Sequence, residues 1–361
     1  MLKYWRKHDM IGLLANNGNE CQYILYAGGN KTYGKCSIKI KLSEENQELR
    51  NKRDILLNKL RKNISEEAAS FTTFNQGSYA MGTGIKPDDG DFDIDVGLKF
   101  DIDHDDYSDP VQVKQWVKDA LDGHTKSVKI RRSCVTVTYQ KDKEPIYHVD
   151  FAVYAANNAD KQMYIAKGKE YSTEEYRIWQ LSDPQELLNY LNSLYDDSDD
   201  RAQFRRVVRY MKKWKNQHFI TSGNNAPTGI ALTALACSYF TPYYSKDFLT
   251  NKKAYDDFKA LKRLINNIQN AFNFTRDSDD GCFYRTITQS LPVQPGNNLF
   301  EKMSNKQMNN FYNQISAMYS KLTEAEGKSK KSEVCQLMID IFGEAFPAAV
   351  DRSYVGTSES A

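Results

Sequence analysis

The segment from residue 75 to residue 98 decides the fold of this chain. It begins with Asn75-Gln76-Gly77-Ser78-Tyr79, passes through a glycine-rich turn, and ends with the alternating run Asp91-Phe92-Asp93-Ile94-Asp95-Val96-Gly97-Leu98. Alternation of polar and apolar residues is typical of a β-strand with one buried face. We therefore expect the aspartates of this run to point to one side of a sheet.

Asp93 and Asp95 are candidate metal ligands. They lie two residues apart, so on a strand their Cα atoms would be about 6.6 Å apart and their side chains would share a face. Like charges in a row repel each other, which a fold tolerates poorly without a cation. Magnesium prefers hard oxygen ligands and is usually held by a few carboxylates together with substrate phosphates. Because a solvated acidic strand has the same pattern, the flanking residues must decide.

A Gly-Ser turn precedes this strand, and a third aspartate follows it. Glycines let backbone N–H groups approach a phosphate, and the Ser78 hydroxyl can donate to a phosphate oxygen. Downstream, two alternating runs, 134–139 and 147–154, flank a turn that contains Pro145, which predicts a hairpin. Asp150 then lies in an otherwise apolar strand, where an unpaired carboxylate is costly.

The rest of the chain suggests two lobes, since 361 residues exceed the usual size of one domain. A helix is expected from Ser43, its N-cap, with Leu49, Leu56, Leu60 and Ile64 on one face. The first half is expected to be helix plus mixed sheet, and helical periodicity dominates from Pro184. The predicted segments are an N-terminal arm (1–42), a core (43–183), a helical lobe (184–350) and a mobile polar tail (351–361).

Residues 201–217 are expected to form a strongly basic helix. Its cationic face would lie beside an apolar one, and such a face can bind a triphosphate. An ordinary amphipathic surface helix has the same pattern. The cationic residues are Arg205, Arg209, Lys212 and Lys213, and the apolar ones are Phe204, Val207, Val208 and Met211.

Composition excludes several classes of protein. Lysine plus arginine (49) nearly balances aspartate plus glutamate (47), so the net charge of +2 gives no overall attraction to nucleic acid or anionic membranes. The six cysteines are far apart and form no C-x-x-C pair, so we expect reduced, mostly buried thiols and no zinc. The chain has no apolar signal core and no run of about 18 apolar residues, so we expect a cytoplasmic protein.

Taken together and in order, four segments resemble the bacterial cGAS/DncV-like nucleotidyltransferases (CD-NTases) of the polymerase-β-like superfamily. These segments are 75–79, 93–97, 148–151 and 205–214. The superfamily signature is hG[GS], then Dh[DE]h, then a third carboxylate on a later strand. The resemblance covers about residues 43 to 350, including 226–232 and 342–347. The gap after Ser78 is longer than in compact members, which leaves open whether Asp91 or Asp93 is the first ligand; we favour Asp93.

The resemblance implies an α+β fold with a polymerase-β-like nucleotidyltransferase core, a mixed β-sheet with helices, and a C-terminal helical lobe. The active site would lie in the cleft of this bilobed molecule. The chain would then be a synthase that makes a cyclic di- or trinucleotide from NTPs. Asp93, Asp95 and Asp150 would be catalytic and hold two Mg²⁺ ions, for which Mn²⁺ can substitute. The residues implied to bind nucleotide are Gln76, Gly77, Ser78, Lys212 and Thr228.

The partners implied are ATP, GTP or pyrimidine NTPs, and an effector that responds to the product in anti-phage (CBASS-type) signalling. Ubiquitin-like ligation machinery acting on the C-terminus at Ala361 is a further implied partner, whereas a membrane or an extended nucleic acid is not. One alternative is a template-independent RNA nucleotidyltransferase, which would need a long basic groove. Another is an inactive nucleotide-binding module, against which the complete aspartate set argues. The bases, the ring size and the linkage (3′–5′ or 2′–5′) stay open.

Overall fold

The computed structural model describes residues 21–25, 36–40, 43–85, 92–125, 127–141, 144–220, 223–344 and 346. Within it the chain forms two compact units. Unit 2 contains residues 41–201 and 290–298, and unit 1 contains residues 1–40, 202–289 and 299–361. Asp91, the alternative to Asp93 as first ligand, lies outside the described residues, as do the loop 86–90, most of the N-terminal arm and the C-terminal tail.

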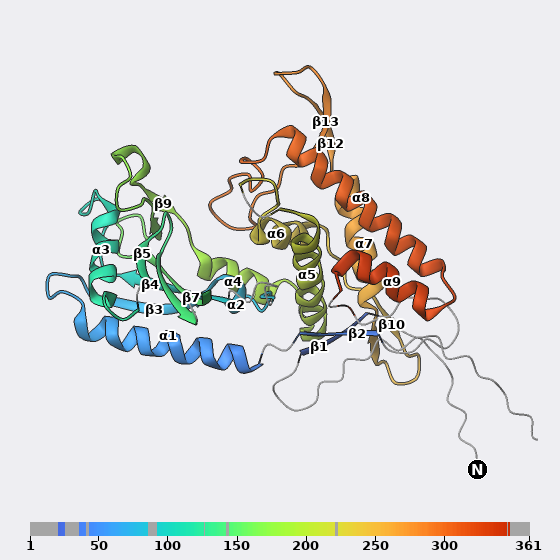
Figure 1. Cartoon of the computed structure of the whole chain (residues 1–361), viewed down its shortest axis with the longest axis horizontal. Helices are drawn as coiled ribbons and strands as arrows, with labels where there is room; N and C mark the ends of the chain where they lie inside the picture. Colours follow the sequence, from blue (N-terminus) through green and yellow to red (C-terminus); the bar gives the residue numbers. More distant parts are fainter. Residues whose placement is uncertain are drawn as a thin grey trace, which may run out of the picture. The chain divides into compact units, whose positions relative to one another are not determined.

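Unit 2 is built on a mixed β-sheet, as the sequence predicted (Figure 1). The strand order is β3-β4-β7-β6-β5; β4 and β7 run parallel, and the other neighbours on this path are antiparallel. Two short strands, β8 and β9, extend the sheet from β7. The bounds are β3 Phe71–Gln76, β4 Phe92–Phe100, β5 Ser127–Ile130, β6 Val135–Lys141, β7 Glu144–Ala155, β8 Tyr164–Ala166 and β9 Trp179–Leu181.

Two helices, α1 (Ser43–Asn63) and α3 (Pro110–Leu121), pack with the strands of this sheet in one hydrophobic core. The apolar residues of β4 that alternate with the aspartates, Ile94, Val96 and Leu98, are fully buried in that core. Alternation along a strand sends Asp93, Asp95 and Gly97 to the opposite face. The helices therefore cover one face of the sheet, and the acidic residues occupy the other.

Unit 2 also contains three shorter helical segments. They are α2 (Gly77–Ala80), the 3₁₀ turn η1 (Glu174–Tyr176) and α4 (Pro184–Ser193). α4 begins with proline, and the Asp183 carboxylate accepts hydrogen bonds from the backbone N–H groups of Gln185 and Glu186. A side-chain cap followed by proline is a strong helix start, and it fixes the chain direction after β9.

Unit 1 is mainly helical. Its helices are α5 (Ser198–His218, which begins in unit 2), α6 (Gly229–Tyr239), α7 (Asp257–Asn270), α8 (Asn305–Gly327) and α9 (Lys331–Phe342). It also contains three two-stranded antiparallel sheets. They are β1 (Cys21–Leu25) with β2 (Cys36–Ile40), β10 (Tyr244–Lys246) with β11 (Lys253–Tyr255), and β12 (Asn273–Arg276) with β13 (Phe283–Thr286). The last of these projects beyond α8 (Figure 1).

Helix α5 is buried on nearly every side, so it is not the ordinary amphipathic surface helix that its pattern left as an alternative. Lys212 and Lys213 are each only 7% exposed, and the aliphatic residues beside them are fully buried. Arg206, which the sequence did not single out, forms a buried two-point ion pair with Asp257 of α7, with Nε–Oδ2 at 2.6 Å and Nη2–Oδ1 at 2.9 Å. Gln203 and Tyr210 donate to the same carboxylate. This network ties α5 to α7.

The cysteines differ from expectation in burial and in oxidation state. Cys134, Cys237 and Cys282 are free thiols, of which the first two are half-buried and Cys282 is exposed, and Cys335 of α9 is disulfide-bonded. The expectation that every cysteine is reduced is therefore wrong for Cys335. Among the described residues, none of the helices is both long and apolar enough to span a bilayer.

Candidate active site

Strand register aligns the expected site residues across three neighbouring strands of unit 2. Gln76, the last residue of β3, lies opposite Asp95 of β4, and Asp95 lies opposite Asp150 of β7. Neighbouring strands are about 4.8 Å apart, and paired residues point to the same face. Asp93 precedes Asp95 by one strand period and is exposed, whereas Asp95 is half-buried. All four side chains therefore belong to the face that α1 and α3 leave uncovered.

The turn after β3 is closed directly over Asp95. Gly77 has a φ of +69°, and a Cβ atom on Gly77 would lie 1.8 Å from Oδ2 of Asp95. Only glycine satisfies both conditions, because it tolerates this backbone conformation and leaves room for the carboxylate. The turn continues as α2, and the Thr83 N–H donates to the Ser78 carbonyl at 2.9 Å. The chain thereby folds back around Ser78, next to a metal-ligand candidate.

Asp150 is the one aspartate of the set that lies on β7, and like Asp95 it is half-buried. Its Oδ1 atom is inaccessible to solvent and accepts no hydrogen bond from any described residue. The neighbouring Cys134 thiol has its pKa raised to about 12, first by burial and then by the Asp150 charge. A buried carboxylate oxygen without a donor costs free energy, and a cation is the partner that suits it. The donor set of three carboxylates on one face therefore fits a hard divalent ion such as Mg²⁺.

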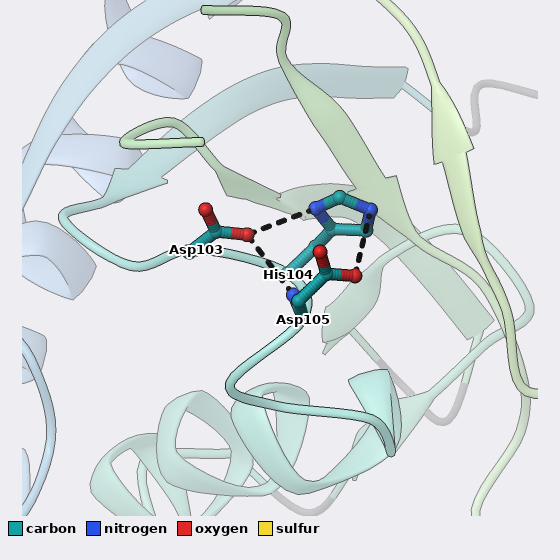
Figure 2. A group of neighbouring side chains, drawn as sticks. All are labelled: Asp103, His104 and Asp105. Carbon is teal, nitrogen blue, oxygen red and sulfur yellow. Dashed lines mark hydrogen bonds and ion pairs between the residues drawn. The ribbon is translucent and has the colours of Figure 1, made fainter. Parts of the chain in front are cut away.

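The described residues also contain a compact group of potential ligands that the sequence did not indicate, Asp103, His104 and Asp105, after β4 (Figure 2). Their ligand atoms all lie within 4.8 Å of one another. The Asp103 carboxylate, however, accepts from the backbone N–H groups of Asp105 (3.0 Å) and Ala159 (2.9 Å), and these hydrogen bonds lower its pKa.

His104 in this group is also held by structural contacts. Its Nδ1 lies 3.0 Å from Oδ1 of Asn158, and its ring stacks on Tyr164 with centroids 4.2 Å apart. The carboxylate and imidazole atoms of Asp103 and His104 are thus engaged in joining two loops at the end of the sheet. Figure 2 shows the Asp103 carboxylate turned toward His104 and the Asp105 backbone. We interpret this group as a loop closure.

The two nucleotide-binding candidates of unit 1 lie together at the start of α6. Thr228 is the N-cap of α6, and its hydroxyl accepts from the Ala231 N–H at 3.2 Å. A Cβ atom on the next residue, Gly229, would lie 3.4 Å from Cε and 3.8 Å from Nζ of Lys212. A helix N-terminus carries partial positive charge, and a lysine beside it adds to that charge. This corner of unit 1 is therefore suited to an anion such as a phosphate.

Comparison with known proteins gives the same class. Residues 71–154 match the family described as cyclic GMP-AMP synthase DncV-like, nucleotidyltransferase domain. The cyclic GMP-AMP synthase of Escherichia albertii is 25% identical over 246 residues, which is 64% of this chain and 52% of that protein. The chain thus spans about half the length of this relative.

Solved structures share the fold. Vibrio cholerae DncV in its 3′-deoxy ATP bound form has a TM-score of 0.60 at 16% identity, with 85% of this chain and 91% of that chain covered. Bradyrhizobium diazoefficiens CdnG in complex with GTP has a TM-score of 0.58 at 12% identity and 82% and 90% coverage. Escherichia coli CdnC, in a complex with HORMA, has a TM-score of 0.57 at 15% identity and 84% and 92% coverage.

The mixed sheet and its helices therefore have the fold of the DncV and CdnG structures. The part of the chain that carries the glycine turn and the aspartates is similar to the nucleotidyltransferase domain of the DncV-like family, as the motifs predicted.

Proposed function

We propose that this protein is a synthase that joins nucleoside triphosphates into a cyclic di- or trinucleotide by nucleotidyl transfer. The observation that carries the proposal is the alignment of Gln76, Asp95 and Asp150 across β3, β4 and β7, with Gly77 closed over the Asp95 carboxylate. It puts a phosphate-binding turn beside a pair of carboxylates on one face of a rigid sheet. Nucleotidyl transfer requires these two elements together.

The metal ligands in this proposal are Asp93, Asp95 and Asp150. The buried Oδ1 of Asp150 and the shared face of all three residues support a pair of Mg²⁺ ions, for which Mn²⁺ could substitute. Such ions, when bound, neutralise charge on the transferring phosphate and lower the pKa of the attacking hydroxyl. β4 and β7 pair over nine consecutive positions, which keeps the backbone positions of these ligands fixed relative to each other.

In this proposal, the Gly-Ser turn and residues of unit 1 bind the donor nucleotide. The Gly77 backbone and the Ser78 hydroxyl would donate hydrogen bonds to phosphate oxygens. Lys212 and the N-terminus of α6 at Thr228 would add positive charge from unit 1. The relatives solved with GTP and with 3′-deoxy ATP support nucleoside triphosphates as the substrate class.

The biological role that we propose is bacterial anti-phage signalling of the CBASS type, in which an effector responds to the cyclic product. Processing of the C-terminus by ubiquitin-like ligation machinery is part of the same proposal, and it concerns residues outside those described. Both parts are supported by the similarity of residues 71–154 to the DncV-like nucleotidyltransferase domain.

The direct test is incubation of the purified protein with each labelled NTP and Mg²⁺ or Mn²⁺, followed by phosphatase treatment and chromatography. Small products that resist phosphatase are expected. Ladders on added RNA would favour a template-independent RNA nucleotidyltransferase instead. The absence of turnover with any NTP and either ion would favour an inactive nucleotide-binding module.

Asp93→Asn and Asp95→Asn are the site variants for this assay. Each is expected to abolish product while the melting temperature stays near or above that of the wild type, because a repulsive charge is removed. Asp105→Asn is the matched control, since the Asp105 side chain is 85% exposed and belongs to the loop closure. Product formation by Asp95→Asn at the wild-type rate would refute the assignment of the site.

A further inference from the structure

A buried tyrosine on the active-site face of the sheet is connected to the catalytic turn. Tyr154, at the end of β7, is 2% exposed, and its hydroxyl donates to Oε1 of Gln76 at 2.7 Å. Gln76 is the residue directly before Gly77-Ser78 and lies opposite Asp95. The hydrogen bond therefore joins the far end of β7 to the residue that begins the phosphate-binding turn.

The hydrogen bond between Tyr154 and Gln76 is possible because Gly97 leaves space on β4, the strand between β3 and β7. A Cβ atom on Gly97 would lie 2.1 Å from Cζ of Phe74, so the Phe74 ring rests directly on the glycine backbone. The Tyr154 ring packs against Phe74, with centroids 5.7 Å apart. An isolated glycine inside a strand often marks such a close approach. The two rings together carry the Tyr154 hydroxyl across β4 to Gln76.

Burial raises the pKa of Tyr154 above its usual value, and the neighbouring Asp95 carboxylate raises it further. The phenol therefore stays neutral, and its proton remains available for the amide oxygen.

The hydrogen bond fixes which end of the Gln76 amide faces the site. An amide has one acceptor end and one donor end, and the Tyr154 hydroxyl uses the acceptor Oε1. The Nε2 group, with its two N–H donors, is then directed away from Tyr154. Gln76 lies beside Asp95 and directly before the turn, where a nucleotide would supply oxygen acceptors.

We propose that Tyr154 is a positioning residue that orients the amide N–H₂ of Gln76 toward phosphate oxygens of the donor nucleotide. This inference rests on the proposed function only in taking an NTP as the ligand of the turn. It adds Tyr154 to the site. The Phe74–Gly97 contact is the feature of the sheet that makes the arrangement possible.

The test combines nucleotide affinity with a double-mutant cycle. The Kd of a non-hydrolysable NTP analogue with Mg²⁺ is measured by calorimetry for the wild type, Tyr154→Phe, Gln76→Ala and the double variant. Tyr154→Phe removes only the hydroxyl and is expected to weaken binding about 5- to 10-fold, as does Gln76→Ala. The double variant is expected to bind no more weakly than Gln76→Ala, because Tyr154 acts through Gln76.

Tyr139→Phe is the matched control, since Tyr139 lies on β6 of the same sheet and its hydroxyl pairs with Nε2 of His124 at 2.8 Å. It is expected to bind the analogue like the wild type. In turnover assays Tyr154→Phe should raise KM more than it lowers kcat, since binding to phosphate is shared by ground and transition states.

Wild-type affinity in Tyr154→Phe, or an undiminished effect of this change in the Gln76→Ala background, would overturn the inference. A protein that binds the analogue and shows the expected cycle but makes no cyclic product would contradict the proposed function and leave this inference supported. A wild type that binds no nucleotide would overturn both.

Discussion

Replacing Gly77 by alanine probes the closest contact of the candidate site. Two costs are expected. Residues other than glycine lose about 1–2 kcal/mol in a left-handed backbone conformation, which Gly77 adopts with φ +69°. In addition, the new Cβ atom would meet Oδ2 of Asp95 at 1.8 Å and Cγ at 2.6 Å, so the carboxylate must rotate away. An off-rotamer side chain costs about 0.5–1.5 kcal/mol. The unfolding free energy should therefore fall by about 2–3 kcal/mol.

Gly123→Ala separates the two costs. Gly123 also has φ +69°, but a Cβ atom there meets nothing within 4 Å. Its replacement should cost only the backbone contribution of about 1–2 kcal/mol and leave nucleotidyl transfer intact. Unfolding is followed by urea titration and transfer by chromatography of the products. Gly77→Ala should lose transfer at temperatures where it is still folded, because Asp95 is displaced.

A second cycle isolates the contact with Asp95. In an Asp95→Ala background the two shortest contacts of the new Cβ atom disappear, and only the one with the Asp95 Cβ at 2.9 Å remains. The stability cost of Gly77→Ala should then fall toward that of Gly123→Ala. Equal stability losses for Gly77→Ala and Gly123→Ala in the wild-type background, together with retained transfer, would refute the steric reasoning.

Three further predictions concern the rest of the molecule. Arg206→Met should lower the unfolding free energy by about 3–5 kcal/mol, because it leaves the Asp257 charge buried without its partner; adding Asp257→Asn should recover part of this, as measured by urea titration. Burial raises the pKa of Cys237 to about 12, so at pH 8 iodoacetamide should label the exposed Cys282 and spare Cys237, as read by mass spectrometry. Because this folded-state pKa is raised, the unfolded thiol ionises first and stability should fall as pH rises above about 9; a flat profile from pH 9 to 11 would contradict this. Thr228→Ala should cost about 1 kcal/mol through loss of the α6 N-cap, whereas Thr228→Ser should keep it, and equal melting temperatures of the two variants would rule out the cap.

The sequence predicted the sheet well because its signals are local. The alternation through Asp93, Ile94 and Asp95 predicts both β4 and the face on which its carboxylates lie, and the structure has them so. The β6–β7 hairpin and the start of α1 are likewise local patterns, and both are confirmed. Asp91 lies outside the described residues, so the choice of Asp93 as first ligand stays a prediction.

Features that depend on contacts between distant segments were not predictable. The basic pattern of α5 is the same for a surface helix and for a buried one, and only the surrounding helices of unit 1 decide between them. The Arg206–Asp257 pair joins residues 51 positions apart, and nothing near Arg206 in sequence indicates it. The group around His104 is recognised as a loop closure only from its contacts with Asn158 and Ala159, which are more than 50 residues away in sequence.

At Gly97 the sequence predicts a close approach, and distant strands determine which side chains approach. A glycine inside an alternating strand is itself a signal that another group approaches closely, and it can be read from the sequence. Which group approaches is decided by β3 and β7, which bring Phe74 and Tyr154 over β4. Local alternation thus selects the face that carries the aspartates, whereas the pairing of three distant strands selects the neighbours that orient the side chains on it. Any side chain at position 97 would therefore disturb Gln76 through the two rings, although Gly97 itself would touch no substrate.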